Sequence, residues 1–455
     1  MIYAELAIPE VSRLVFGRAP KPVACGFGLT IGAGQVYPEV NFTLPAITID
    51  GVNWNQVLTH YEEMARNIVK RAVSLRVPGI VLEFELLPAM TSTPQWGAEI
   101  TALLHRHLSE AHEKHGLACA LRVTPTDIRD QSKPPRLRSG EAVEQLKRSF
   151  ELCIQAGADI MSIESVGGKE IHDAGLMYGD VRSLAFALGV LAPRDMAWLW
   201  GDITRMCSGS KAVAGGDTAC GFANTAMQLA HQKMLPEVLA AVVRSMSAVR
   251  SLVAFEQGAV GPSKDCAYEG PVIKALTGCP ISMEGKSAAC AHFSPVGNIA
   301  AAMCDLWSNE SVQNVRLLSG NAPEVFTEVL AYDCRLMNAA AASGGALALQ
   351  RWLIDSDEHL SPQAAVLSPR ATIRIATAIA KADSHYHATV NAGLAAVGLL
   401  RESVDAGTLN LNRKEAVWLD RIDSDLQALP GNEGSLVNEM RDLHAGVFDP
   451  ASYAL

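Results

Sequence analysis

Short apolar runs alternate with longer helical patterns from about residue 22 to about residue 310. The short runs have the length and composition of buried strands. In chain order they are KPVACGFGL, GIVLEFELL, ACALRVTPTD, DIMSIESVG, MAWLWGD, KAVAGGDTA, SLVAFEQGAV and, with the weakest pattern, SAACAHF. Between them, apolar residues recur at three- and four-residue spacing, which predicts helices such as 55–75, 141–157 and 224–250.

Continuous apolar strands separated by helices predict a parallel sheet that is covered on both faces. Eight such units favour a closed (β/α)8 barrel of the TIM type. A doubly wound open sheet is the alternative, and the barrel is preferred because no G-x-G-x-x-G follows the first strand. The long insert 31–54 is expected to form a hairpin or a cap over one end of the barrel.

The strand-like runs fade after about residue 310, and the helical patterns continue almost to the end of the chain. Three stretches carry them: VFTEVLAYDCRLMNAAAA, the long run 369–400 and RKEAVWLDRIDSDLQAL. We therefore expect two regions, a barrel over 1–310 that carries the active site and a C-terminal helical region over 311–455 that packs on it.

Composition narrows the class of protein. The 455 residues are 49% hydrophobic and 19% charged, which is a globular composition, and the formal net charge is −10. Without a long basic run, the chain is not expected to bind nucleic acid or an acidic membrane. The N-terminus lacks the pattern of a signal peptide, and no apolar stretch of membrane-spanning length is found. The ten cysteines include no C-x-x-C pair, so we expect a cytoplasmic protein whose thiols are reduced.

Polar residues stand where the predicted strands end, and this is the face on which α/β barrels place their chemistry. The candidates are Glu83, Glu85, Asp127, Glu164, Asp217, Cys220 and Cys266. Two thiolates and a carboxylate, from Cys220, Cys266 and Glu164, would suit a catalytic zinc site with one open position. Spacing alone leaves the alternative of two buried structural cysteines open, since such cysteines are common in protein cores.

Other residues are weaker candidates. The pairs His105/His107 and His385/His387 lie two positions apart on helical patterns, so their side chains diverge. His292 is more typical of a histidine with a structural hydrogen bond, and GKSAAC lacks the frame of a phosphate loop. Glu83 and Glu85 face the same side of a strand, and two carboxylates inside a barrel require a nearby cation or a proton. We read that requirement as consistent with zinc.

Several long segments carry a more specific signal than single residues do. They are LVFGRAPKPV, GFGLTIGAGQVYPEVN, MSIESVGGKE, AGGDTAC with ANTAM, AVGPSKDCAYEGP, EGKSAACAH, CDLWSNESV and the ending FDPASYAL. Segment by segment, they resemble the zinc-containing catalytic subunit of methanol:corrinoid methyltransferases. The resemblance implies an α/β barrel with added helices and zinc held by Glu164, Cys220 and Cys266. It also implies a corrinoid protein as partner and a homodimer. Cys279 is not expected to be a ligand, whereas Asp217, Asp265 and Glu269 are candidates for contacts around the ligands.

The chemistry implied by this resemblance is methyl transfer from an alcohol oxygen to Co(I) of a corrinoid. Zinc would stabilise the charge that develops on the leaving oxygen, and Glu83, Glu85 and Asp127 are the hypothetical acids. The chain departs from the methanol-type pattern around the two glutamates, where it has Phe84 and Leu86. If these side chains line the pocket, the methyl donor could instead be a methoxylated aromatic compound, which makes an O-demethylase component the alternative. A non-catalytic zinc-bearing scaffold is the further alternative.

Overall fold

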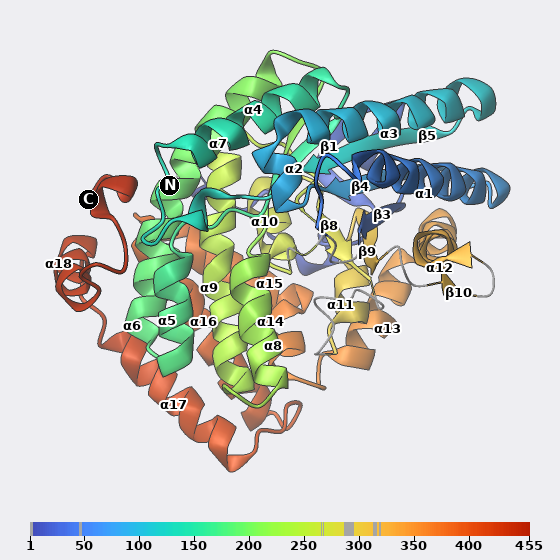
Figure 1. Ribbon diagram of the computed structural model, residues 1–455. Helices are drawn as coiled ribbons and strands as arrows, with labels where there is room; N and C mark the ends of the chain where they lie inside the picture. The colour runs from blue at the N-terminus through green and yellow to red at the C-terminus, as the bar shows by residue number, and fades with distance from the viewer. Residues whose placement is uncertain are drawn as a thin grey trace.

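The computed structural model describes residues 3–44, 48–264, 266, 268–285, 295–312, 316–317 and 320–455. Its centre is a parallel sheet in the order β7-β6-β5-β4-β3-β9-β8, which curls into a barrel surrounded by helices (Figure 1). The strands of this sheet are β3 (Tyr37–Thr43), β4 (Gly79–Glu85), β5 (Ala118–Thr124), β6 (Ile160–Ile163), β7 (Val213–Asp217), β8 (Ser282–Glu284) and β9 (Leu306–Val312). The prediction of a TIM-type α/β barrel is confirmed.

The barrel is closed by an extended segment between its two edge strands, β7 and β8. The backbone N–H of Val260 donates to the carbonyl of Ala214 on β7 at 2.9 Å. On the other side, the N–H of Ser263 donates to the carbonyl of Pro280, just before β8, at 3.3 Å. Residues 258–264 therefore take the place of an eighth strand, and the chain enters the barrel mouth as this segment ends.

Several predicted strands were wrong. The run MAWLWGD lies within α7 (Ala192–Ser208), and most of SLVAFEQGAV lies within α9 (Glu237–Glu256). KPVACGFGL contributes to β1 (Arg18–Cys25), which pairs with β2 (Leu29–Ala33) in an antiparallel hairpin outside the barrel sheet. Such short apolar runs do not distinguish a helix from a buried strand, because they are too short to show the period of either one. SAACAHF lies outside the described residues.

The expectation for the insert 31–54 was also wrong, because it contains the first strand of the barrel, β3, rather than only a hairpin or cap. β3 pairs in parallel with β4 on one side and with β9 on the other. Its sequence, YPEVNFT, carries Glu39 and Asn41 on the inward face. These inward polar residues make the run less apolar than a typical buried strand. A pattern of continuous apolar residues therefore does not predict it.

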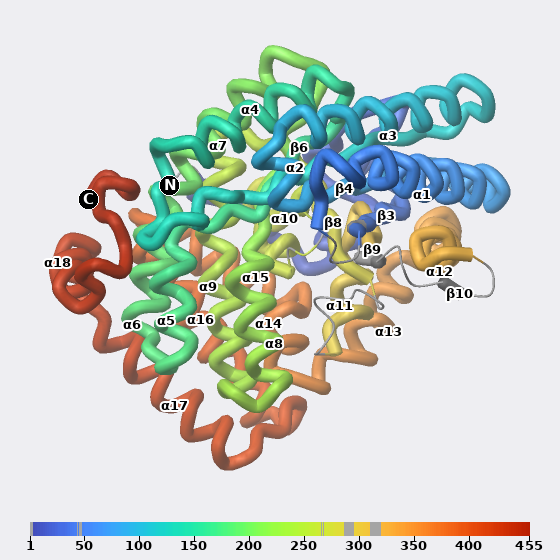
Figure 2. Tube along the Cα trace, in the orientation of Figure 1, coloured from blue at the N-terminus to red at the C-terminus, as the bar shows by residue number. Residues whose placement is uncertain are grey.

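Helices surround the barrel and continue into the C-terminal region (Figure 2). Between residues 54 and 277 they are α1 (Trp54–Ser74), α2 (Pro88–Ser92), α3 (Pro94–His115), α4 (Glu141–Gln155), α5 (Lys169–Tyr178), α6 (Val181–Phe186), α7, α8 (Thr225–His231), α9 and α10 (Gly270–Thr277). Two π-helical segments interrupt them, η3 (Ala187–Leu191) and η4 (Cys220–Asn224). Short 3-10 turns cover η1 (Val11–Arg13), η2 (Arg129–Gln131) and η5 (Pro450–Tyr453).

The remaining elements follow β8. They are α11 (Gly297–Ala301), the small hairpin of β10 (Arg316–Leu317) and β11 (Gly320–Asn321), α12 (Ala322–Ala342), α13 (Ala346–Asp357), α14 (Pro362–Leu367), α15 (Pro369–Ala380), α16 (His385–Asp405), α17 (Arg413–Gln427) and α18 (Glu433–Leu443). α12 packs on β3, β9 and α1, whereas α14, α16 and α17 pack around α9. The division near residue 310 remains a prediction.

Helix α9 is the central helix of this packing. It is the one helix in the described part of the chain that is long and apolar enough to cross a membrane, but its whole apolar window is buried inside the fold. α7, α8, α14 and α16 surround it. Its burial also explains why the end of this helix, SLVAF, looks like a strand in the sequence.

Candidate metal centre

Three side chains meet at the mouth of the barrel, and each comes from a different loop. Glu164 directly follows β6, Cys220 opens the π-helix η4 after β7, and Cys266 follows the extended segment 258–264. Their ligand atoms all lie within 4.8 Å of one another. Two thiols and one carboxylate are a donor set that suits Zn²⁺, and three protein ligands leave a position for a substrate. The residues that the sequence singled out therefore form a group that could hold zinc.

A cavity of about 400 Å³ opens beside this group. Glu164 and Gly221 lie in its wall, so the cavity reaches the candidate metal position from two of the three ligand loops. The loop after β5, residues 125–131, supplies much of the remaining wall, and Glu85, Val166 and Lys169 are also part of it. This places a substrate-sized space next to the open side of the ligand group.

The two residues that departed from the methanol-type pattern do not line this cavity. Phe84 is fully buried and contacts the ring of Tyr61 on α1, with ring centroids 4.9 Å apart. Leu86 is buried next to Gly97 of α3. Both side chains pack between the barrel and its outer helices, so the expectation that they shape the substrate pocket was wrong. The run MAWLWGD, which was predicted as a strand, belongs to helix α7, so it brings no strand end to the cavity.

Glu83 and Glu85 both point into the barrel, as their spacing predicted. Lys264 lies between them, with its Nζ 2.9 Å from Oε1 of Glu83 and 2.5 Å from Oε1 of Glu85. The cation that two inward carboxylates require is thus supplied by this lysine, which the sequence analysis did not single out. The available signal was its place in the same segment as Cys266, two residues earlier.

A second ion pair lies deeper in the barrel. Nε of Arg122 donates to Oε1 of Glu39 at 2.6 Å, and Ser282 also donates to Glu39. Nη1 of Arg122 donates to Ser162 at 2.8 Å and to the carbonyl of Pro262 at 3.0 Å. Strands β3, β5, β6 and β8 and the closing segment are therefore tied together by polar contacts beneath the site.

A buried carboxylate fixes the two loops that carry Glu164 and Cys220. Asp217 accepts hydrogen bonds from the backbone N–H groups of Ser165, at 3.3 Å, and Thr218, at 2.8 Å. It also accepts from Nε1 of Trp200 at 2.9 Å and pairs with Arg250 at 3.2 Å. Asp217 thus contacts neither cysteine, and it positions both ligand loops through their backbone.

The remaining contacts around the cysteines come from three elements. Asn224, on the same π-helix as Cys220, donates from Nδ2 to its Sγ at 3.4 Å. Glu269 accepts from the backbone N–H of Ala219 at 2.7 Å, and burial raises the pKa of this carboxyl group. Sγ of Cys266 donates to Oε1 of Glu284 at 3.2 Å. Each cysteine therefore has a polar neighbour in addition to its fellow ligands, whereas Asp265 lies outside the described residues.

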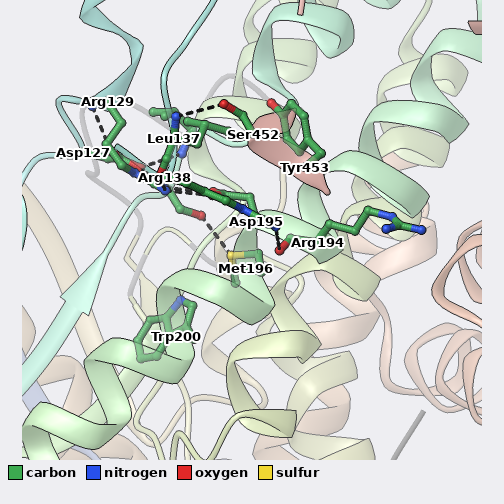
Figure 3. A network of polar contacts seen from close by, with 12 residues as sticks. Asp127, Arg129, Leu137, Arg138, Arg194, Asp195, Met196, Trp200, Ser452 and Tyr453 are labelled. Atoms are coloured by element: carbon green, nitrogen blue, oxygen red, sulfur yellow. Dashed lines mark hydrogen bonds and ion pairs between the residues drawn. The ribbon is translucent and has the colours of Figure 1, made fainter. Parts of the chain in front are cut away.

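Asp127 lines the cavity, but its carboxylate is engaged (Figure 3). Arg129 donates to both of its oxygens, at 2.9 and 2.7 Å, and the N–H of Val166 donates at 3.1 Å. Arg129 also pairs with Asp195 at 2.7 Å. These contacts make Asp127 an anchor between the loops after β5 and β6, whereas Glu85 is the other candidate acid that lines the cavity.

The C-terminal turn η5 holds the same loops from outside. The hydroxyl of Tyr453 accepts from the N–H of Gly168 at 2.9 Å and donates to Glu170 at 2.7 Å. The hydroxyl of Ser452 accepts from the N–H of Leu137 at 3.4 Å (Figure 3). The end of the chain is therefore part of the frame that surrounds the cavity.

The other sequence candidates lie elsewhere. Cys279 is buried outside the ligand group, and burial raises the pKa of its thiol. His385 pairs with Glu256 at 2.7 Å, His387 pairs with Asp383, and His107 lies 3.8 Å from Glu62. His105 lies against the ring of Phe27. His292 and most of GKSAAC fall outside the described residues.

The fold and the site together define an α/β-barrel enzyme with a candidate metal centre at the carboxyl ends of its strands. The chain belongs to the methanol-cobalamin methyltransferase B subunit family, whose model matches residues 1–454, and it is a methyltransferase. It is 35% identical over 458 residues to a methanol–corrinoid protein co-methyltransferase of Methanosarcina barkeri, covering 99% of this chain and 98% of the relative. The crystal structure of the methanol:cobalamin methyltransferase complex MtaBC from Methanosarcina barkeri matches it with a TM-score of 0.96 at 35% identity. That match covers 100% of this chain and 99% of the other.

Proposed function

We propose that this protein is a zinc-dependent methyltransferase that takes the methyl group of methanol and transfers it to Co(I) of a partner corrinoid protein. The observation that carries the proposal is the group of Glu164, Cys220 and Cys266 within 4.8 Å at an open cavity. The relative's name and the complex in which the matching structure was solved support methanol as donor and a corrinoid protein as partner. They do not favour the O-demethylase alternative.

In this reaction the C–O bond of methanol breaks, and the cobalt supplies the electron pair for the new bond to carbon. Hydroxide is a poor leaving group, so the oxygen must be stabilised and must take up a proton. Zinc, when bound, supplies a Lewis acid that stabilises the charge on this oxygen. Because two thiolates and a carboxylate outweigh the charge of the ion, the site retains a net negative charge, and a proton donor from the protein becomes important.

Glu85 is the best placed of the three candidate acids. It lines the cavity, and 26% of its side chain is exposed there. Nδ2 of Asn41 donates to its Oε1 at 3.1 Å, which fixes the carboxyl group on the inner face of β4. Glu83 lies deeper, where it accepts from the hydroxyl of Thr124 at 3.0 Å and pairs with Lys264 at 2.9 Å. We propose that Glu85 is the carboxyl group that passes a proton to the leaving oxygen and that Glu83 supports it by holding Lys264, which contacts both.

The direct test is a spectroscopic assay of the corrinoid protein. The purified enzyme is mixed with Co(I) corrinoid protein and either methanol or a methoxylated arene, and conversion to methyl-cobalt is followed. We expect conversion with methanol and a dependence on bound zinc. An inert methanol sample beside an active methoxyarene would refute the choice of donor.

A second comparison separates an enzyme from a zinc-bearing scaffold. Cys266→Ala should abolish transfer and metal binding, whereas full transfer by this variant would refute the metal mechanism. Cys279→Ala is the matched control, since it removes a buried thiol outside the ligand group. Homodimer formation and a cytoplasmic location stay predictions.

A further inference from the structure

A fully buried lysine sits among three carboxylates at the floor of the site. Nζ of Lys264 lies 2.9 Å from Glu83, 2.5 Å from Glu85 and 3.8 Å from Glu164. The lysine side chain has no exposed area. One cation therefore contacts both candidate acids and also approaches the carboxylate of the ligand group.

The backbone beneath this lysine is fixed independently of the site. Arg122 donates to the carbonyl of Pro262 at 3.0 Å, and the N–H of Ser263 is bonded to Pro280. The extended segment then presents Lys264 to the barrel interior, above the pair of Arg122 and Glu39. Because the segment is held on both sides, the backbone position from which Lys264 reaches the carboxylates is set by the barrel.

We propose that Lys264 is a positioning residue that divides the three carboxylates between two tasks. It holds Glu83 and Glu85 as hydrogen-bonded partners at the substrate, and it leaves Glu164 to ligate the metal. An ammonium group has three donors and no acceptor, so two of them can serve the two glutamates. A zinc ion accepts carboxylate ligands readily, and catalysis requires that one position stay open. Without Lys264, the metal becomes the nearest cation for Glu85, and this carboxylate fills the open position.

This inference rests on the proposed function, since it assumes a metal at Glu164, Cys220 and Cys266. Its test uses Co²⁺ in place of zinc, so that the coordination is read from the spectrum rather than from activity. Four-coordinate cobalt absorbs strongly in the visible range, and a fifth ligand weakens these bands. Thiolate-to-cobalt bands in the near ultraviolet show that both cysteines remain bound.

For Lys264→Met we expect retained thiolate bands, visible bands weakened by about half or more, and methyl transfer reduced about 10- to 100-fold. Adding Glu85→Gln removes the competing carboxylate, so the double variant should regain the visible bands of the wild type. Lys264→Arg keeps the cation and should show the wild-type spectrum.

Lys274→Met is the matched control, because Lys274 is equally buried and pairs with Asp305 at 2.8 Å near the start of β9. It should lower stability and leave the cobalt spectrum unchanged.

Two results would overturn the proposal. One is a wild-type cobalt spectrum in Lys264→Met, and the other is an altered spectrum that Glu85→Gln does not restore, since the lysine would then act on the fold alone. If Lys264→Met does not fold, the double variant and Lys264→Arg are compared with the wild type instead. Weakened visible bands in either variant would then contradict the proposal. Failure of the wild type to use methanol refutes the proposed function instead, because the spectral comparison needs no methyl donor.

Discussion

Replacing Asp217 by Asn should loosen both ligand loops at once. The carboxylate is buried and pairs with Arg250, whose side chain is also fully buried. Asn keeps one oxygen, which can still accept from the N–H groups of Ser165 and Thr218. Its amide group must then face Nε1 of Trp200, which is also a donor, across the 2.9 Å of the present hydrogen bond.

The cost follows from these contacts. Leaving one partner of a buried ion pair without the other costs about 3–5 kcal/mol. Arg250 keeps hydrogen bonds to the carbonyl of Thr218, at 2.8 Å, and to the carbonyl of Ser165, at 3.3 Å. We therefore expect the lower part of this range, about 3 kcal/mol, in the free energy of unfolding. Metal affinity should fall about 10- to 100-fold, because the backbone beside Glu164 and Cys220 is no longer fixed.

Urea unfolding and competition with a zinc-binding dye measure the two quantities separately. Asp305→Asn is the matched control: it removes a buried carboxylate near the start of the strands, where Asp305 pairs with Lys274, and it should lower stability without changing zinc affinity. Adding Trp200→Phe to Asp217→Asn removes the opposed donor and should recover about 1 kcal/mol. Unchanged zinc affinity in Asp217→Asn would refute the view that this residue positions the ligands.

Three further predictions concern the metal content, the pH dependence of stability and the C-terminal turn. Dialysis against a chelator should abolish methyl transfer, and zinc should restore it in the wild type and in Cys279→Ala but not in Cys266→Ala, as measured by metal content and transfer rate. Burial raises the pKa of Asp159 to about 6 from an ordinary value near 4, so the folded state loses stability as the pH rises between these values. Asp159→Asn should therefore be more stable than the wild type by about 3 kcal/mol above pH 6, with no gain below pH 4, in urea titrations at several pH values. Tyr453→Phe leaves the buried N–H of Gly168 without its acceptor and should cost about 1–3 kcal/mol in the same assay, and an unchanged midpoint would contradict the role given to the C-terminal turn.

The sequence predicted the barrel but misplaced several of its strands. Alternation of apolar runs and helical patterns was sufficient for the fold class, because a parallel sheet covered by helices produces it whatever the exact strands are. MAWLWGD is part of the amphipathic helix α7, and the run is too short to show a helical period. SLVAF was assigned as a strand because α9, which is buried on all sides, is as apolar as a buried strand. β3 was missed for the opposite reason, since Glu39 and Asn41 on its inner face make it look like a surface segment.

By itself, the sequence determined the class of fold, the strand-end position of the candidate chemistry and, through resemblance to a family, the identity of Glu164, Cys220 and Cys266 as the residues to test. Only the tertiary structure decided how these residues are supported. Lys264 and Asp217 stand close to Cys266 and Cys220 in the sequence, but their contacts with Glu164 and with the residue after it join segments far apart in the chain, as does the contact of Arg250 with Ser165. Such contacts depend on which side chains the closed barrel brings into one interior. Phe84 and Leu86 show the same limit of sequence-based reasoning. Their position beside the two glutamates suggested that they line the substrate pocket, but their side chains point toward the outer helices. A strand places alternate residues on opposite faces, and the pairing of the sheet and its helices decides what each face meets.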